Sequence, residues 1–339
     1  MNQQVNKSDY GRMMTRLISN SVGLFVMLFF VLLSTTEPAF AQSNSVKPSG
    51  PQPRVQLIIL GVAQDAGYPQ AGCYKPHCMP AWRDPSKQRL ATSLAVIEHQ
   101  NKVKYLFEAT PDIKTQLFRL HEVAPDEQYS LAGVFLTHAH MGHYTGLMHF
   151  GREAMGSQNL PVYAMPKMSS FLTNNGPWQQ LVKLGNIKLK PLADGQPTKL
   201  SAQLTVVPVK VPHRDEYSET VGYKIIGPNK TALFIPDIDK WQKWKLSIAE
   251  QIKQVDFALL DATFFANGEL PNRDMSEVPH PFVEESMQLL NKLSDEQKAK
   301  VIFIHFNHSN PLLIENSHAQ QQVRKNGFSF ANEGMMLDL

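Results

Sequence analysis

Three closely spaced histidines constrain this chain more than any other feature of its sequence. His138, His140 and His143 follow the apolar stretch 133–137, which reads as a strand, and a helix-like stretch starts near Tyr144. Imidazole nitrogens bind zinc at about 2.0–2.1 Å, and three of them leave a fourth position open for water. A single histidine is usually an ordinary surface or core residue, but three at one strand end predict a metal site.

Short apolar runs bounded by turn residues predict strands, and apolar residues at helical spacing predict helices between them. The predicted strands are residues 55–61, 94–98, 103–107, 133–137, 160–164, 187–192, 204–209, 221–226, 232–235, 257–260 and 301–306. The predicted helices are residues 113–120, 145–155, 169–174, 248–253 and 281–293. The chain is therefore an α/β protein. The order of its elements does not choose between one doubly wound sheet and two packed sheets with helices outside.

The histidine motif resembles the first metal-binding motif of the metallo-β-lactamase superfamily, whose usual form is His-x-His-x-Asp-His. The resemblance implies a four-layer αβ/βα sandwich, two packed β-sheets with helices outside, in one catalytic domain over residues 55–339. Gly142 stands where the family has the Asp that ordinarily binds a second metal ion. We therefore expect one tightly bound zinc ion and a second that binds only conditionally, with iron or manganese as the alternative metals.

Later segments follow the order of the superfamily's other ligands. A Val-Pro-His segment makes His213 the fourth candidate ligand. Asp237 takes the place of the bridging carboxylate, and it is preferred over Asp239 because it lies nearer to the strand end. His305 matches the final ligand best by position, and His308 is the alternative from the following turn.

From this resemblance, His138, His140 and His213 are expected to form the tighter site. His143 joins that site or faces the second one, and Asp237 binds or bridges the second ion with His305. Zinc lowers the pKa of a bound water to about 7, so hydroxide is available at neutral pH.

Asp261 ends a predicted strand in an acid-Ala-Thr segment that resembles one in the phosphodiesterase branches of the superfamily. That segment is followed there by a histidine at a helix start, which in this chain is His280. The resemblance implies that His280 protonates a leaving group while Asp261 orients the imidazole. With Asp237, these two residues are the catalytic candidates. The alternative is a helix-start histidine without a role.

A closer resemblance, spanning most of the chain from residue 55, is to the pyrroloquinoline quinone biosynthesis protein B group. The segments that carry it are residues 67–70, 212–222 and 305–311, together with two cysteines. Proteins of this group hold a structural zinc ion in a cysteine-rich knuckle. Here Cys73, His77 and Cys78 fall one ligand short of the usual four, so a structural metal site and a disulfide both remain open.

The first 41 residues resemble a secretory signal peptide, because basic residues precede the apolar run 22–33 and an Ala-Phe-Ala segment that ends at Ala41. Residues 42–54, rich in Ser, Pro, Gln and Asn, predict a solvated linker. We expect a periplasmic or secreted protein whose signal segment touches the membrane only transiently; an uncleaved anchor is the alternative.

The charge balance and its distribution give no support for a nucleic-acid partner. Without the signal segment, which holds three basic and two acidic residues, the chain keeps 30 Lys+Arg and 28 Asp+Glu. It also lacks a basic cluster interleaved with aromatic residues. A small-molecule substrate is expected, and the sequence leaves the oligomeric state open.

Three functions follow from these observations. The leading hypothesis is an exported metal-dependent hydrolase that cleaves an ester, phosphodiester or related bond of a small molecule. The second is an oxidative, iron-dependent step of cofactor biosynthesis, and the third is a non-catalytic metal-binding protein.

Overall fold

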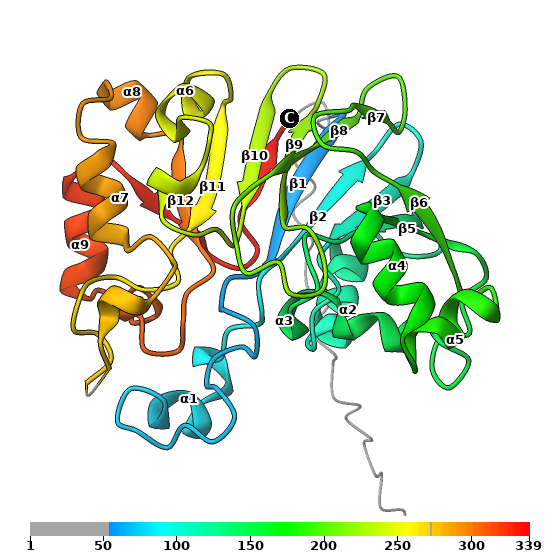
Figure 1. The fold of residues 1–339 in the computed structure, drawn as a ribbon, viewed down its shortest axis with the longest axis horizontal. Helices are drawn as coiled ribbons and strands as arrows, with labels where there is room; N and C mark the ends of the chain where they lie inside the picture. The colour runs from blue at the N-terminus through cyan, green and yellow to red at the C-terminus, as the bar shows by residue number, and fades with distance from the viewer. Residues whose placement is uncertain (1–53, 272) are drawn as a thin grey trace, which may run out of the picture. The chain divides into compact units, whose positions relative to one another are not determined.

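The computed structural model describes residues 54–271 and 273–339 (Figure 1). The predicted signal peptide, residues 1–41, and all but the last residue of the predicted linker, residues 42–54, lie outside these ranges and stay predictions. Among the described helices, none has the length and apolar character needed to span a membrane.

The described strands form two seven-stranded mixed sheets. In the first sheet the order is β14-β1-β2-β3-β4-β5-β6, and in the second it is β13-β12-β11-β10-β9-β8-β7. The first sheet contains β1 (Val55–Gly61), β2 (Ser93–Glu98), β3 (Val103–Phe107), β4 (Ser130–Phe135), β5 (Leu160–Ala164), β6 (Ile187–Pro191) and β14 (Met336–Asp338). The second contains β7 (Thr198–Lys199), β8 (Thr205–Lys210), β9 (Val221–Ile226), β10 (Thr231–Ile235), β11 (Phe257–Asp261), β12 (Val301–Ile304) and β13 (Ser329–Phe330).

Each sheet is antiparallel at one end and parallel at the other. Strands β3 to β6 pair in parallel in the first sheet, as do β10 to β13 in the second. The carboxyl ends of parallel strands meet at one edge of a sheet, where α/β proteins place their ligands. A ligand-binding site is therefore expected at the segments that follow β4, β10, β11 and β12.

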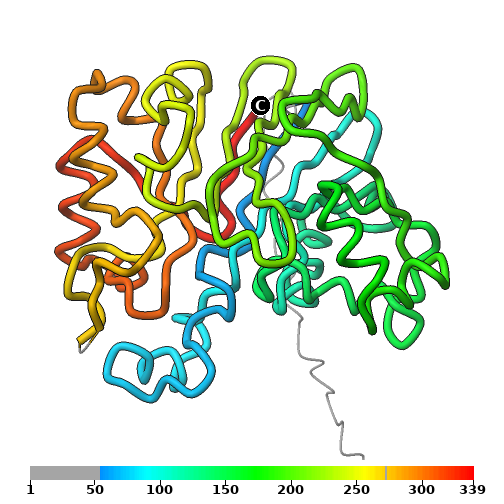
Figure 2. The backbone as a smooth tube through the Cα atoms, viewed as in Figure 1, coloured from blue at the N-terminus to red at the C-terminus, as the bar shows by residue number. Residues whose placement is uncertain are grey.

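Helices cover the outer faces of both sheets. Those that follow strands of the first sheet are α2 (Ile113–Val123), α3 (Met141–Tyr144), α4 (Pro166–Asn174) and α5 (Trp178–Lys183). Those that follow strands of the second are α6 (Ile248–Lys253), α7 (Val283–Leu289), α8 (Asp295–Lys298) and α9 (His318–Lys325). Helix α1 (Met79–Arg83) lies in the connection between β1 and β2. Figures 1 and 2 show α7 and α9 beside β12, and α4 and α5 on the side of β5 and β6.

Strand β1 shows why two sheets stack. Its side chains alternate between faces, as the pleat requires. Leu57 and Ile59 belong to a core cluster that also includes Tyr223 of the second sheet. Ile58 and Leu60 belong to a second cluster with Leu120 of α2. A strand with apolar residues on both faces is buried on both, so the layers run helix, sheet, sheet, helix.

The α/β class and the packed two-sheet architecture are confirmed, and the longer predicted strands lie close to their observed positions. The predicted helix 145–155 is wrong. A 3-10 helix spans Thr145–Phe150, and turns follow it. Gly146 packs so closely that an added Cβ would lie 2.1 Å from the carbonyl oxygen of Thr110. This close backbone approach explains a glycine in place of a helix former.

The other differences concern short elements. The predicted helix 281–293 ends at Leu289 as α7. Not predicted were the edge strands β7, β13 and β14 and the helices α1, α3, α5, α8 and α9.

Candidate metal centre

The predicted ligands lie where strands of both sheets end. His138, His140 and His143 follow β4 of the first sheet. From the second sheet, Asp237 follows β10 and His305 follows β12 directly. The backbone φ of His305 is 72°, a left-handed conformation in which its side chain is fully buried.

The first cluster contains His138, His140, His213 and Asp237, with one potential ligand atom of each within 4.8 Å of the others. His140 Nδ1 lies 2.8 Å from His138 Nε2 and 3.3 Å from His213 Nε2. Asp237 Oδ2 lies 3.4 Å from His138 Nε2 and 3.3 Å from His213 Nε2. Three imidazoles and a carboxylate form a ligand set that suits zinc.

The second cluster contains Asp65, His143 and His305, again within 4.8 Å of one another. His143 Nε2 lies 3.2 Å from Asp65 Oδ1, and His305 Nε2 lies 3.9 Å from the same oxygen. Asp237 Oδ2 is 3.8 Å from His143 Nε2, so this carboxylate lies between the two clusters. His143 therefore faces the second cluster, one of the two places expected for it.

Each of the five histidines places its second ring nitrogen near an oxygen outside the clusters, and four of these contacts, all but that of His143, are hydrogen bonds. The pairs are His138 Nδ1 with Thr137 Oγ1 (2.9 Å), His140 Nε2 with Glu216 Oε2 (3.1 Å), His143 Nδ1 with Glu108 Oε2 (3.4 Å), His213 Nδ1 with Asp239 Oδ1 (3.3 Å) and His305 Nδ1 with Thr263 Oγ1 (3.0 Å). Metal-binding histidines are held in this way, because the outer partner fixes the tautomer and the ring orientation.

The charges at the centre also fit a metal ion. Burial lowers the pKa of His138 well below its usual range and lowers the pKa of His305, which favours the neutral imidazole that binds metal. Burial also acts to lower the pKa of His143 and His213, but the neighbouring carboxylates outweigh it and raise both of these pKa values. Burial raises the pKa of Asp237, but the neighbouring His213 and His280 outweigh it and bring this pKa well below its usual range. The centre thus holds a buried carboxylate among imidazoles, where a cation is stabilised.

His280 and Asp261 form a third group beside the two clusters. His280 Nδ1 lies 2.9 Å from Asp261 Oδ2 and 3.1 Å from Asp237 Oδ1. Thr263 donates to Asp261 Oδ1 through its backbone nitrogen and its hydroxyl. Burial lowers the pKa of His280, but the two carboxylates outweigh burial and raise it to about 10. A protonated imidazole therefore stands next to the candidate metal centre.

A cavity of about 440 Å³ adjoins this group and is large enough for a small molecule. Asp65 and His280 line it, as do Arg214 and Arg273. Its other polar lining residues are Gln64, Gln70, Asn307 and His308. Two arginines in one cavity suit a carboxylate or phosphate.

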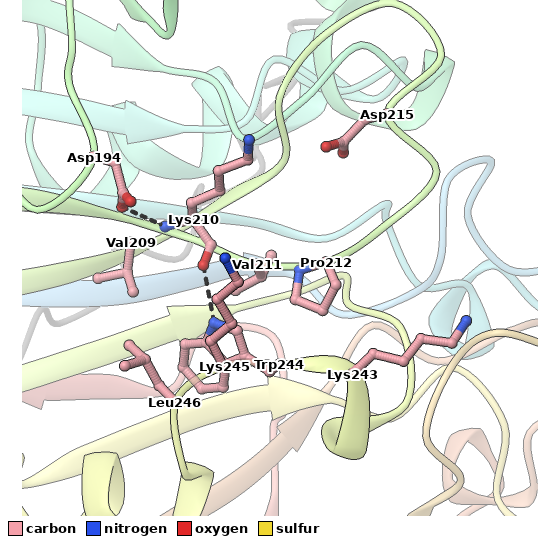
Figure 3. Close-up of a pocket in the computed structure, with 10 residues that line it drawn as sticks. All are labelled: Asp194, Val209, Lys210, Val211, Pro212, Asp215, Lys243, Trp244, Lys245 and Leu246. Atoms are coloured by element: carbon pink, nitrogen blue, oxygen red, sulfur yellow. Dashed lines mark hydrogen bonds between the residues drawn. The ribbon is translucent and has the colours of Figure 1, made fainter.

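Another cavity, of about 420 Å³, lies beside β8 and contains no member of the metal clusters (Figure 3). Its wall is held by the backbone nitrogen of Lys210, which donates to Asp194, and by Trp244 Nε1, which donates to the Lys210 carbonyl. Of these two cavities, only the first adjoins the metal clusters.

Cys73 and Cys78 form a disulfide with 6.1 Å between their Cα atoms, one of the two outcomes left open by the sequence. His77 Nε2 lies 3.5 Å from Cys73 Sγ, and the ring of His308 lies 5.6 Å from that of His77. The alternative expectation for His308 is thereby corrected. This side chain lies with the cysteines, because the turn after His305 carries it away from the second cluster.

Two acidic residues at the centre were not identified from the sequence. Asp65 follows β1, and the fully buried Glu108 follows β3 with a φ of 81°. Both acids lie just beyond predicted strands, which is the signal that would have found them.

Comparison with known proteins gives a family and a set of relatives. Residues 104–306 match the model of the β-lactamase superfamily domain. The coenzyme PQQ synthesis protein B of Methylobacterium sp. (strain 4-46) is 27% identical over 307 residues, covering 84% of this chain and 100% of the relative. The protein of the same name from Gluconobacter oxydans (strain 621H) is 26% identical over 316 residues, covering 84% and 99%.

Two solved structures show the same fold. The Zn²⁺-bound PqqB of Methylobacterium extorquens has a TM-score of 0.70 at 23% identity, covering 84% of this chain and 100% of that one. A diphosphatase of the PhnP family has a TM-score of 0.57 at 22% identity, covering 84% and 96%.

Proposed function

The chain belongs to the β-lactamase superfamily, and from this premise we propose that it is a metal-dependent hydrolase acting on an ester, phosphodiester or related bond of a small molecule. The observation that carries the proposal is the position of Asp237 between two ligand clusters. His138, His140, His213 and Asp237 would hold a zinc ion there, and it would supply Lewis-acid activation of a water molecule at neutral pH.

The chain's own residues supply binding and proton transfer. Arg214 and Arg273 bind an anionic group of the substrate in the adjoining cavity, since guanidinium groups pair well with carboxylate or phosphate. His280 donates a proton to the leaving group, and Asp261 holds its imidazole in position. The diphosphatase with the same fold is in keeping with a phosphate-containing substrate.

Two phosphodiesters that differ only in their leaving group test this assignment. Loss of a proton donor matters most when the leaving group is a poor one, so His280→Ala should slow an alkyl diester by about 10²- to 10⁴-fold and a p-nitrophenyl diester far less. His318→Ala, a change at an exposed histidine on α9, is the control. Equal losses on both substrates would remove His280 from the role of proton donor.

A second candidate function is oxidative chemistry in cofactor biosynthesis. It is favoured by relatives named coenzyme PQQ synthesis protein B, which match over their whole length. Metal analysis of the purified protein, followed by assays of diester cleavage and dioxygen uptake, separates the two. Zinc or manganese with diester turnover supports hydrolysis, whereas iron with dioxygen uptake supports the second function. Bound metal with neither activity indicates a metal-binding protein without catalysis.

We further propose that the protein is exported to the periplasm or secreted, because its first 41 residues have the pattern of a signal peptide. Cell fractionation and N-terminal sequencing test this. A mature protein that starts after Ala41 is expected, and a cytosolic protein that retains Met1 contradicts it.

A further inference from the structure

Asp65 fills the space that a side chain at position 142 would need. Gly142 lies in α3, between His140 and His143, where the metallo-β-lactamase motif has Asp. A Cβ added to Gly142 would lie 2.3 Å from Asp65 Cα and 2.6 Å from Asp65 Oδ1. The loop after β1 thus brings a carboxylate to the place left free by the glycine.

Asp65 Oδ1 lies near two imidazole nitrogens, those of His143 and His305, without a hydrogen bond to either. Asp65 Oδ1 is buried, and no residue in 54–271 or 273–339 gives it a hydrogen bond of acceptable geometry. The same holds for His143 Nε2 and His305 Nε2, which lie 3.2 Å and 3.9 Å from it. Buried polar atoms are nearly always satisfied, so three unsatisfied ones that face one another indicate a missing ligand.

The backbone supports the same conclusion. The φ of Asp65 is 35°, a conformation that few residues other than glycine adopt. Such strain persists where the surroundings hold a functional group in place. Here the conformation directs Oδ1 into the second cluster while part of the side chain stays accessible from the cavity.

We propose that Asp65 is the anionic ligand of a second divalent metal ion, bound together with His143, His305 and the shared Asp237. The carboxylate is thereby supplied by the loop after β1, and Gly142 is required for it to fit. The inference rests on the metal centre of the proposed function but not on hydrolysis. The sequence predicts one tightly bound ion and a second that binds only conditionally. The inference is that both ions bind tightly.

Metal stoichiometry of Asp65→Asn tests the proposal, because the substitution keeps the shape of the side chain and removes its charge. Protein is equilibrated with buffered zinc and measured by mass spectrometry, and stepwise cobalt titration follows the absorption of each site. Two ions are expected in the wild type. In Asp65→Asn the second ion should bind at least about 100-fold more weakly, while the first is retained. Asp295→Asn, at a carboxylate that is 99% exposed, should keep both ions.

The outcomes separate this inference from the proposed function. A second ion that binds equally well to wild type and Asp65→Asn overturns the role of Asp65, and so does a wild type that holds only one ion. Either result is compatible with a metal-dependent hydrolase. A wild type that binds no metal overturns both proposals.

Gly142→Ala tests the steric half of the proposal without removing any carboxylate. Its added Cβ should displace Asp65 and weaken the second ion in the same way, with the fold checked by circular dichroism. If Gly142→Ala binds the second ion as tightly as the wild type does, Asp65 does not need a glycine at position 142 in order to fit.

Discussion

His213 depends on a carboxylate that does not face the metal centre. Asp239 Oδ1 lies 3.3 Å from His213 Nδ1, and Lys243 Nζ lies 2.8 Å from Asp239 Oδ2. We expect Asp239→Ala to weaken the first metal ion by about 10- to 100-fold, because the imidazole loses the partner that orients it. Competition with a chromogenic chelator measures the affinity. Asp295→Ala is the matched control, and equal affinities in the two variants would exclude an orienting role.

Glu269 should make stability depend on pH. Burial raises the pKa of this carboxyl to about 7, although Ser309 and the backbone of Phe265 donate to it. The folded state therefore favours the proton more than the unfolded state does. The free energy of unfolding should fall by about 3 kcal/mol as pH rises from near 4.5 through 7.

Urea unfolding at pH 5 and pH 8 tests this. Glu269→Gln should lose that part of the pH dependence and be more stable than the wild type at pH 8. Glu127→Gln, an exposed control, should follow the wild type. The idea fails if Glu269→Gln and the wild type lose the same free energy between the two pH values.

The histidines of the centre were predictable because imidazoles cluster next to apolar strands, a pattern that few structural needs produce. His138, His143 and His305 are examples. Asp65 was not predictable in this way, since a single acid after a strand is usually a solvated loop residue. The loop after β1 comes close to the histidine motif only in the folded chain. The close approach of Asp65 to Gly142 is what identifies this acid as a candidate ligand.

Between the elements, one hydrogen bond joins the two sheets just ahead of the histidine motif. Tyr223 of β9 is fully buried, and its hydroxyl donates to the carbonyl of Leu136, directly after β4. Tyr223→Phe leaves that carbonyl without its donor, so it should lower the free energy of unfolding by about 1–3 kcal/mol. Chemical denaturation measures the change.

Tyr163→Phe is the matched control, because Tyr163 stacks on Phe135 but is only partly buried. It should cost well below 1 kcal/mol. Similar losses in the two variants would show that the bond to Leu136 contributes nothing particular.

Sequence patterns predict the central strands well because those strands are apolar on both faces, as β1 and β12 illustrate. Short edge elements carry no such pattern. Strand β7 has two residues, and the four-residue helix α8 has no buried side chain, so each depends on pairing or capping that the fold provides. The pairing of two sheets likewise came from the family resemblance and not from the order of elements.

For the domain as a whole, a metal ion bound at the proposed centre would cross-link the two sheets. Its ligands come from the segment after β4 in the first sheet and from those after β10 and β12 in the second. A ligand that binds only the folded state stabilises it by mass action, by about 4 kcal/mol at a thousand times its dissociation constant. The protein should therefore be less stable after its metal has been removed than in the metal-bound form.

We expect dialysis against a chelator to lower the thermal midpoint by roughly 5–10 °C, and added zinc to restore it. The variant His138→Ala, which lacks a ligand of the first cluster, should respond less than the wild type because it has less bound metal to lose. Calorimetry in the presence and absence of chelator measures both. If the chelator does not change the thermal midpoint of the wild type, metal binding does not contribute to its stability. The two sheets are then held together by their apolar cores alone.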